Sequence, residues 1–197
     1  MSKGALNGIK VVEIAGIGPG PCAGMMLADM GAEVTVIDRP VADPETAAAF
    51  AKYTIFNRGK KSVALNLKDP DAQEVLGGLV KEADVLVENF RPGTLEKWNL
   101  GWDVLSALNP KLVMLRVSGY GQTGPFAGKP GFAAIAEAIG GLRYLIGYPD
   151  RAPVRTGVSI GDTLASLYGV IGTMMALRHA EQTGEGQVVD VSLIESV

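Results

Sequence analysis

The sequence lacks the features that mark secreted, membrane-spanning and nucleic-acid-binding proteins. It has one cysteine, Cys22, so no disulfide can form within the chain, and a reducing compartment is expected. A net charge of -3 gives no support to a nucleic-acid partner. The first residues carry no apolar signal core, and the apolar stretch 164–177 is short and interrupted by glycine. We therefore expect a cytoplasmic protein with no membrane partner.

What the sequence does contain is typical of a large α/β domain. Hydrophobic residues make up 47% of its 197 residues, enough to bury a sizeable core. Many of the 26 glycines fall where a strand would turn into a helix. Alternating strand and helix patterns with short connections predict a doubly wound, Rossmann-like, mostly parallel sheet.

The pattern places each expected element along the chain. Residues 40–53 are polar and alanine-rich and are expected to form a surface excursion. The sequence stops inside the apparent start of a further helix, which suggests a part of a larger domain. The expected strands are 9–14, 33–38, 62–67, 85–88, 111–118 and 187–193. Helices are expected to end near residues 30, 82 and 108, and two more are expected from 133 to about 145 and from 163 to about 181.

The glycine-rich turn after the first strand resembles a dinucleotide-binding loop. Asp38 closes the second strand about where a ribose-binding carboxylate would lie. Against this interpretation, Pro21 replaces the third glycine of the motif, and Pro19 and Pro21 both lack the N–H that a pyrophosphate would use. A tight turn that packs a helix against a strand is the alternative.

Asp162 precedes the most apolar helix, and from sequence alone it is best explained as a helix N-cap. Lys60 and Lys61 form a charge pair that would ordinarily be solvated, and Glu137 is expected on a solvated helix face. Trp98, Trp102 and Met114 are expected to be packing residues.

Eight segments, taken in order, resemble the class III CoA-transferase family, which includes formyl-CoA transferases, L-carnitine CoA-transferases and α-methylacyl-CoA racemases. Single segments are weak signals, but their order and spacing together are specific, and they cover nearly the whole chain. The segments are 6–13, 18–21 (Gly-Pro-Gly-Pro), 31–40, 57–62 (Asn-Arg-Gly-Lys-Lys-Ser), 84–93, 118–125, 161–162 (Gly-Asp) and 183–187 (Thr-Gly-Glu-Gly-Gln).

The resemblance implies that residues 1–197 are the N-terminal part of a large Rossmann-like, CoA-binding domain. The small domain and the returning C-terminal segment of the family would be absent, and full-length members would form interlocked homodimers. It implies a CoA-transferase that moves coenzyme A from an acyl-CoA to a small carboxylic acid. It implies no metal and no prosthetic group, with coenzyme A as a substrate.

The resemblance also assigns roles to single residues. Asp162 matches the catalytic aspartate, which forms a covalent acyl intermediate, and Gly161 would let the thioester approach it closely. The loop 119–131 is a candidate lid that excludes water. The residues implied to contact coenzyme A are Gly18, Pro19, Arg39, Leu65, Lys68, Asn89, Phe90, Arg91 and Lys97, with Lys60 and Lys61 as possible additions at the basic rim.

Three sequence differences bear on the reaction. A racemase of this family needs a histidine where this chain has Phe132, and phenylalanine cannot accept a proton. The single histidine, His179, lies near the end of a helix, where a cation suits the helix dipole. Ala133 replaces a frequent acidic residue, and Gly18 replaces a glutamine of formyl-CoA transferases, so the acceptor acid stays open. A racemase-like isomerase and a non-catalytic CoA-binding fragment are the alternatives.

Overall fold

A parallel sheet forms the centre of the computed structural model, which describes residues 4–41 and 54–197. Its strand order is β3-β2-β1-β4-β5-β6, the order of a Rossmann fold, and every neighbouring pair is parallel. The predicted fold class is therefore confirmed. The strands are β1 (Lys10–Glu13), β2 (Glu33–Asp38), β3 (Lys61–Ala64), β4 (Val85–Glu88), β5 (Val113–Ser118) and β6 (Val188–Ser192).

Apolar, often β-branched runs form the central strands. Every residue of β4 and β5 is buried, as expected for parallel strands that are covered on both faces. The edge strand β3 is exposed along its whole length. The strands that carry the site are therefore held rigidly in the middle of the sheet.

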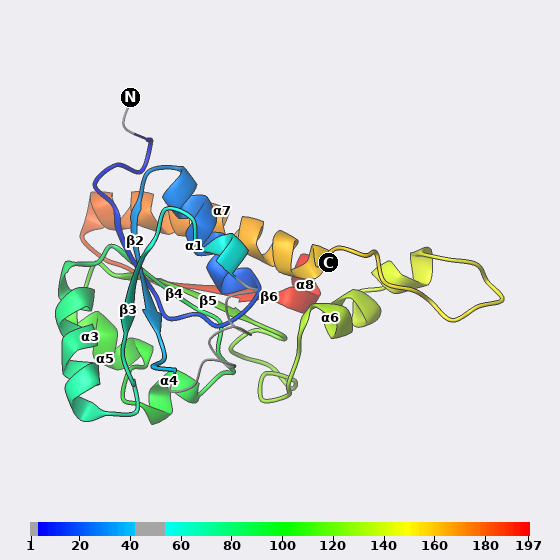
Figure 1. Ribbon diagram of the computed structural model, residues 1–197, viewed down its shortest axis with the longest axis horizontal. Helices are drawn as coiled ribbons and strands as arrows, with labels where there is room; N and C mark the ends of the chain where they lie inside the picture. The colour runs from blue at the N-terminus through cyan, green and yellow to red at the C-terminus, as the bar shows by residue number, and fades with distance from the viewer. Residues whose placement is uncertain (1–3, 42–53) are drawn as a thin grey trace.

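Helices cover both faces of the sheet (Figure 1). One face is packed against α1 and α7, whose core residues include Leu27 and Val170, and the other against α3 and α5, whose core residues include Leu76 and Leu105. The helices are α1 (Pro19–Asp29), η1 (Thr54–Phe56), α3 (Pro70–Glu82), α4 (Thr94–Lys97), α5 (Trp102–Leu108), α6 (Ala133–Ile139), η2 (Leu142–Leu145), α7 (Ile160–Thr183) and α8 (Leu193–Ser196).

The segment 140–158, which we call the arm, extends away from the body of the molecule between α6 and α7 (Figure 1). One continuous helix from residue 133 to about 145 was expected, and this expectation is wrong. The helix α6 ends at Ile139 because two glycines follow, and Gly141 has a left-handed φ of 88°. Of the expected surface excursion, residues 42–53 lie outside the described residues.

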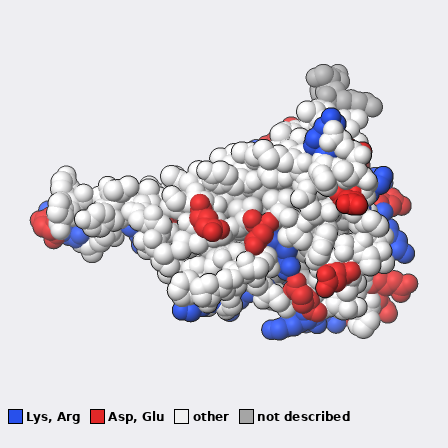
Figure 2. All heavy atoms as spheres, turned by 180° about the vertical axis from the view of Figure 1, so that it is seen from behind, with Lys and Arg blue, Asp and Glu red and all other residues white. Residues whose placement is uncertain are grey.

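The helix α7 is long and apolar enough, by length and composition, to cross a membrane, and 44% of its most apolar window is buried in the protein. The core helix of a soluble protein passes the same test. Its buried side packs against α1 and β5. Its outer side exposes Leu167, Tyr168, Ile171 and Met175, and Figure 2 shows that few charged side chains lie along this part of the surface.

Candidate functional site

Two cavities lie at the carboxyl ends of β1 and β4, where the strand order reverses direction. This point of an open parallel sheet is the usual place for a ligand. The segment that follows β1 (14–18) and the segment that follows β4 (89–92) contribute lining residues. Gly18 and Phe90 line both cavities, so they separate one from the other.

The smaller cavity has a volume of about 330 Å³ and contains Asp162. Its remaining ionisable lining side chains are Arg91, Lys129 and Arg155. The apolar part of the wall includes Phe90, Val117, Phe132 and Leu193. A small polar substrate therefore meets one carboxylate among three cations.

Asp162 lies in the first turn of α7, at the third helical position. The helix begins at Ile160, three residues earlier than expected, and the N-cap is Ser159. Among the described residues, no backbone N–H donates to the Asp162 carboxylate, so the interpretation of Asp162 as an N-cap is wrong. Asp162 instead lines the smaller cavity.

Burial raises the pKa of the Asp162 carboxyl, the negative charge of Glu137 raises it further, and Arg155 opposes the rise. A carboxylate with a raised pKa is a stronger nucleophile once it is ionised. Glu137 was expected on a solvated helix face, and this expectation is wrong. Its side chain is fully buried, because it lies on the side of α6 that faces the body, and its nearest cation is Arg143 at 3.8 Å.

Glycine at position 18 provides the space that the Asp162 carboxylate occupies. Gly18 has a φ of 89°, and an added Cβ would lie 3.3 Å from the carboxylate's Cγ and Oδ2 atoms. The expected role of Gly161 stays a prediction: an added Cβ there would meet Ala133, which lines the smaller cavity, and Val197, each at 3.4 Å. Gly161 thus packs closely against α6, and Gly18 is the glycine that lies next to the Asp162 carboxylate.

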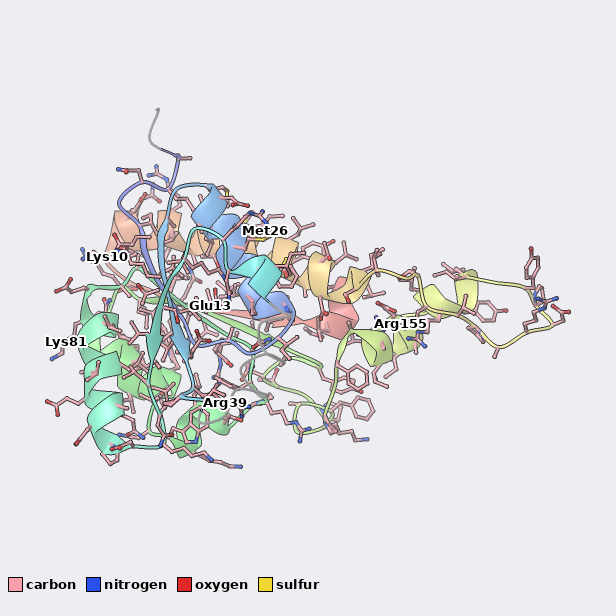
Figure 3. All side chains as sticks on the ribbon, viewed as in Figure 1. Lys10, Glu13, Met26, Arg39, Lys81 and Arg155 are labelled. Carbon is pink, nitrogen blue, oxygen red and sulfur yellow. The ribbon has the colours of Figure 1, made fainter. Side chains whose placement is uncertain are left out.

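The larger cavity, of about 1040 Å³, is large enough for a nucleotide. Its lining includes Arg39, which follows β2 and is labelled in Figure 3, and Leu65 and Lys68, which follow β3. Among the other residues proposed to contact coenzyme A, Pro19, Asn89 and Arg91 line the smaller cavity, and Gly18 and Phe90 line both. Lys97 lies at the end of α4 and lines neither.

The residues after β4 hold the glycine-rich turn. Asn89 accepts a hydrogen bond from Gly16 N at 2.8 Å and donates one to Ile17 O at 2.8 Å. Phe90 packs edge-on against Trp98, with ring centroids 5.4 Å apart. As expected, Trp98 packs against the core, and it also lines the larger cavity. These contacts fix the partition between the cavities.

The structure contains a buried ion pair that the sequence did not suggest, and one of its members, Glu13, lines the larger cavity. Glu13 ends β1, and its Oε2 atom is 2.6 Å from Lys60 Nζ, with each side chain only 1% exposed. Lys60 also donates to Pro21 O at 2.9 Å. The expectation that both lysines of the charge pair are solvated is therefore wrong for Lys60, while Lys61 pairs with Glu33 at the surface.

A second buried carboxylate, Glu88, ends β4. Its Oε1 atom accepts from Arg116 Nε at 2.7 Å, and its Oε2 atom accepts from Phe90 N at 2.7 Å. Arg116 also donates to Glu96 in α4 at 2.8 Å. These hydrogen bonds fix the start of the segment 89–92, which follows β4. No spacing in the sequence signals it, because its members come from three separate elements.

The loop that was proposed as a lid begins and ends in the smaller cavity. Gly119 and Gly131 both line it, and an added Cβ on Gly119 would lie 2.6 Å from Gly131 Cα. The backbone at the two ends of the loop is therefore in close contact. Phe132 lines the same cavity as Asp162, so an apolar ring lies where a racemase would need a base.

The turn after β1 offers few donors to a pyrophosphate. Pro19 and Pro21 occupy the first turn of α1 and have no N–H. The Asp38 carboxylate accepts a hydrogen bond from Ser62 Oγ at 2.7 Å. Among the described residues, no group of three histidine, cysteine, aspartate or glutamate side chains could hold a metal ion.

The site combines a Rossmann-like sheet, a cavity large enough for a nucleotide and an adjoining cavity that is lined by a carboxylate. The sequence matches CoA-transferase family III over residues 6–197. The chain therefore belongs to CoA-transferase family III, as the sequence resemblance predicted.

Curated relatives and solved structures agree with this family. The chain is 47% identical to the succinyl-CoA–L-malate CoA-transferase beta subunit of Chloroflexus aurantiacus, covering 98% of this chain and 50% of that protein. It is 38% identical to succinate–glutarate CoA-transferase of Agrobacterium fabrum, covering 98% and 52%. The structure of a CAIB/BAIF family protein from Brucella suis superposes with a TM-score of 0.93 at 36% identity, covering 99% of this chain and 55% of that one. The chain thus spans about half the length of the curated relatives that it matches.

Proposed function

We propose that the protein is a CoA-transferase in which Asp162 carries the acyl group and then coenzyme A. The observation that carries the proposal is the Asp162 carboxylate, which caps no helix and has a raised pKa. It lines a small cavity next to a nucleotide-sized one. Arg39 and Lys68 are placed to meet the nucleotide of coenzyme A in the larger cavity. The turn from Gly18 to Pro19 lies between the two.

The reaction balances through two half-reactions without an outside reductant, oxidant or proton. A carboxylate oxygen of Asp162 bonds to the acyl carbonyl carbon of the donor, and the carbon–sulfur bond breaks. CoA thiolate departs, and a mixed anhydride remains on Asp162. The thiolate then attacks the aspartyl carbonyl, so the donor acid departs and an aspartyl-CoA thioester remains. The acceptor carboxylate repeats these steps in reverse order, which restores Asp162 and releases the new acyl-CoA.

Dicarboxylic acids are the substrates that we infer. The relatives are named for succinyl-CoA with malate and for succinate with glutarate, all of them small dicarboxylic acids. The three cations around the smaller cavity suit an acid that keeps a second negative charge. We therefore infer succinyl-CoA as donor and a small dicarboxylic acid as acceptor.

A racemase-like isomerase and a non-catalytic CoA-binding fragment are the alternatives. The apolar Phe132 in the wall of the cavity argues against a two-base racemase. The free Asp162 carboxylate argues against a purely binding role. We infer that the protein acts in the cytoplasm as a homodimer, and the strongly exposed Tyr144 and Leu145 of the arm are apolar surface that a partner subunit would cover.

Trapping of the intermediate tests the covalent mechanism. The longest natural polypeptide that carries this sequence is incubated with succinyl-CoA and hydroxylamine, and peptide mass spectrometry should find a hydroxamate at Asp162. Asp162→Asn should lose at least about 10³-fold in transfer rate, because a neutral amide is a poor nucleophile. Asp103→Asn is the matched control, since Asp103 lies in the first turn of α5 away from both cavities. Undiminished transfer by Asp162→Asn would contradict the proposal.

A further inference from the structure

The smaller cavity has more positive than negative side chains. Among the described residues that line it, Asp162 is the one acidic side chain, and Arg91, Lys129 and Arg155 are the cations. When the carboxylate of Asp162 is converted into an anhydride or thioester, it loses its charge, and the three cations face the cavity alone. A cavity with this balance favours a ligand that brings an anionic group which takes no part in the bond rearrangement.

Arg155 is the cation that acts most directly on the nucleophile. Burial and Glu137 raise the pKa of Asp162, and Arg155 is the cation that opposes them. Within residues 4–41 and 54–197, no carboxylate forms an ion pair with Arg155. Figure 3 shows Arg155 where the arm returns to the body of the molecule. Its guanidinium is therefore available for an anion that binds beside Asp162.

The other two cations are placed differently. Lys129 Nζ lies 4.3 Å from the centre of the Phe126 ring, so its charge already has an aromatic partner. Arg91 directly follows Phe90, which lines both cavities, and itself lines the smaller one. Neither contributes to the shifted pKa of Asp162. Of the three cations, Arg155 is therefore the one whose charge affects the pKa of the Asp162 carboxyl.

We propose that Arg155 binds the second carboxylate of the dicarboxylic acid while its first carboxylate reacts at Asp162. The inference rests on the proposed transferase function and assigns its substrate selectivity to one residue. A planar guanidinium can hold a carboxylate through two parallel N–H···O bonds, which fixes both position and orientation. A monocarboxylic acid of equal length presents a methyl group there and leaves the guanidinium without that partner.

A matched pair of acceptor acids tests this assignment. Glutarate and pentanoate have the same number of carbons and differ in the distal group, and neither is the acid that succinyl-CoA releases. In a reaction that passes through a covalent enzyme intermediate, kcat/KM for the acceptor does not depend on the donor half-reaction. We measure it for both acids, with succinyl-CoA as donor, in the longest natural polypeptide that carries this sequence and in its Arg155→Gln variant. The control is Arg151→Gln, since Arg151 lies in the arm over Tyr148 and lines neither cavity.

The ratio of the two kcat/KM values is the readout. In Arg155→Gln, the preference for glutarate over pentanoate should fall by roughly 10- to 100-fold, the range of one lost charge-assisted hydrogen-bonded contact. In Arg151→Gln, the ratio should stay at the wild-type value. Arg155→Lys, which keeps the charge but not the planar fork, should give an intermediate ratio.

Other outcomes would overturn the assignment. If Arg155→Gln lowers both kcat/KM values by the same factor, Arg155 acts on Asp162 in general and not on the distal carboxylate. If Lys129→Gln abolishes the preference and Arg155→Gln preserves it, Lys129 is the selecting residue. If the wild-type protein transfers coenzyme A to neither acid, the proposed function fails, and this result is distinct from a failure of the Arg155 assignment alone.

Discussion

The buried pair of Glu13 and Lys60 leads to a pH dependence that a surface ion pair would not show. Burial raises the pKa of Glu13 from its usual 4.5 to about 7, although Lys60 lowers it and Asp38 adds a small rise. Loss of water around the carboxylate therefore outweighs the attraction of the lysine. Replacing Glu13 by glutamine keeps the shape and removes the titration.

The sign and size follow from proton linkage. The folded protein holds the Glu13 proton more tightly than the unfolded chain does, because the folded pKa is the higher one. The contribution of this group to stability is thus complete below pH 4.5 and is lost as the pH rises through about 7. At roughly 1.4 kcal/mol per pH unit, the loss amounts to about 3 kcal/mol over this window.

Urea unfolding of the wild-type protein and of Glu13→Gln, at half-unit steps from pH 4.5 to 8, measures this directly. The free energy of unfolding of the variant, relative to wild type, should rise by about 3 kcal/mol across the window. The difference between the two proteins removes the contributions of groups that titrate in both. A difference that is constant with pH would refute the reasoning, because it would show that Lys60 keeps the pKa of Glu13 at or below its usual value.

Two further predictions concern neighbouring parts of the site. Arg116→Met should lower the free energy of unfolding by about 3–5 kcal/mol, measured by urea unfolding at pH 7, because it leaves the Glu88 carboxylate buried without its cation. A loss below 1 kcal/mol would contradict this. Gly18→Ala should reduce kcat at least about 10-fold, because its Cβ presses on the Asp162 carboxylate and its φ of 89° is unfavourable for alanine. A steady-state assay at saturating succinyl-CoA checks it, and unchanged kcat would show that the carboxylate can move aside.

The local pattern of the chain predicted the elements of the fold but not all of their ends. Buried β-branched runs and proline or glycine at helix boundaries identified the strands and most helices. The start of α7 was placed three residues late, and this error turned Asp162 into an apparent cap. The sequence carries no strong start signal there, because Ser159 makes no side-chain capping bond.

By itself, the sequence determined the fold class and the family, because these depend on residue order and on local spacing. The role of Asp162 as candidate nucleophile came only from the family resemblance. The tertiary structure alone decided that Gly18 faces that carboxylate, that Glu137 is buried near it, and that Lys60 pairs with Glu13. Such contacts join residues that are distant in the chain and brought together by parallel strands. Burial and charge at these contacts depend on the whole packed environment, which no local pattern encodes.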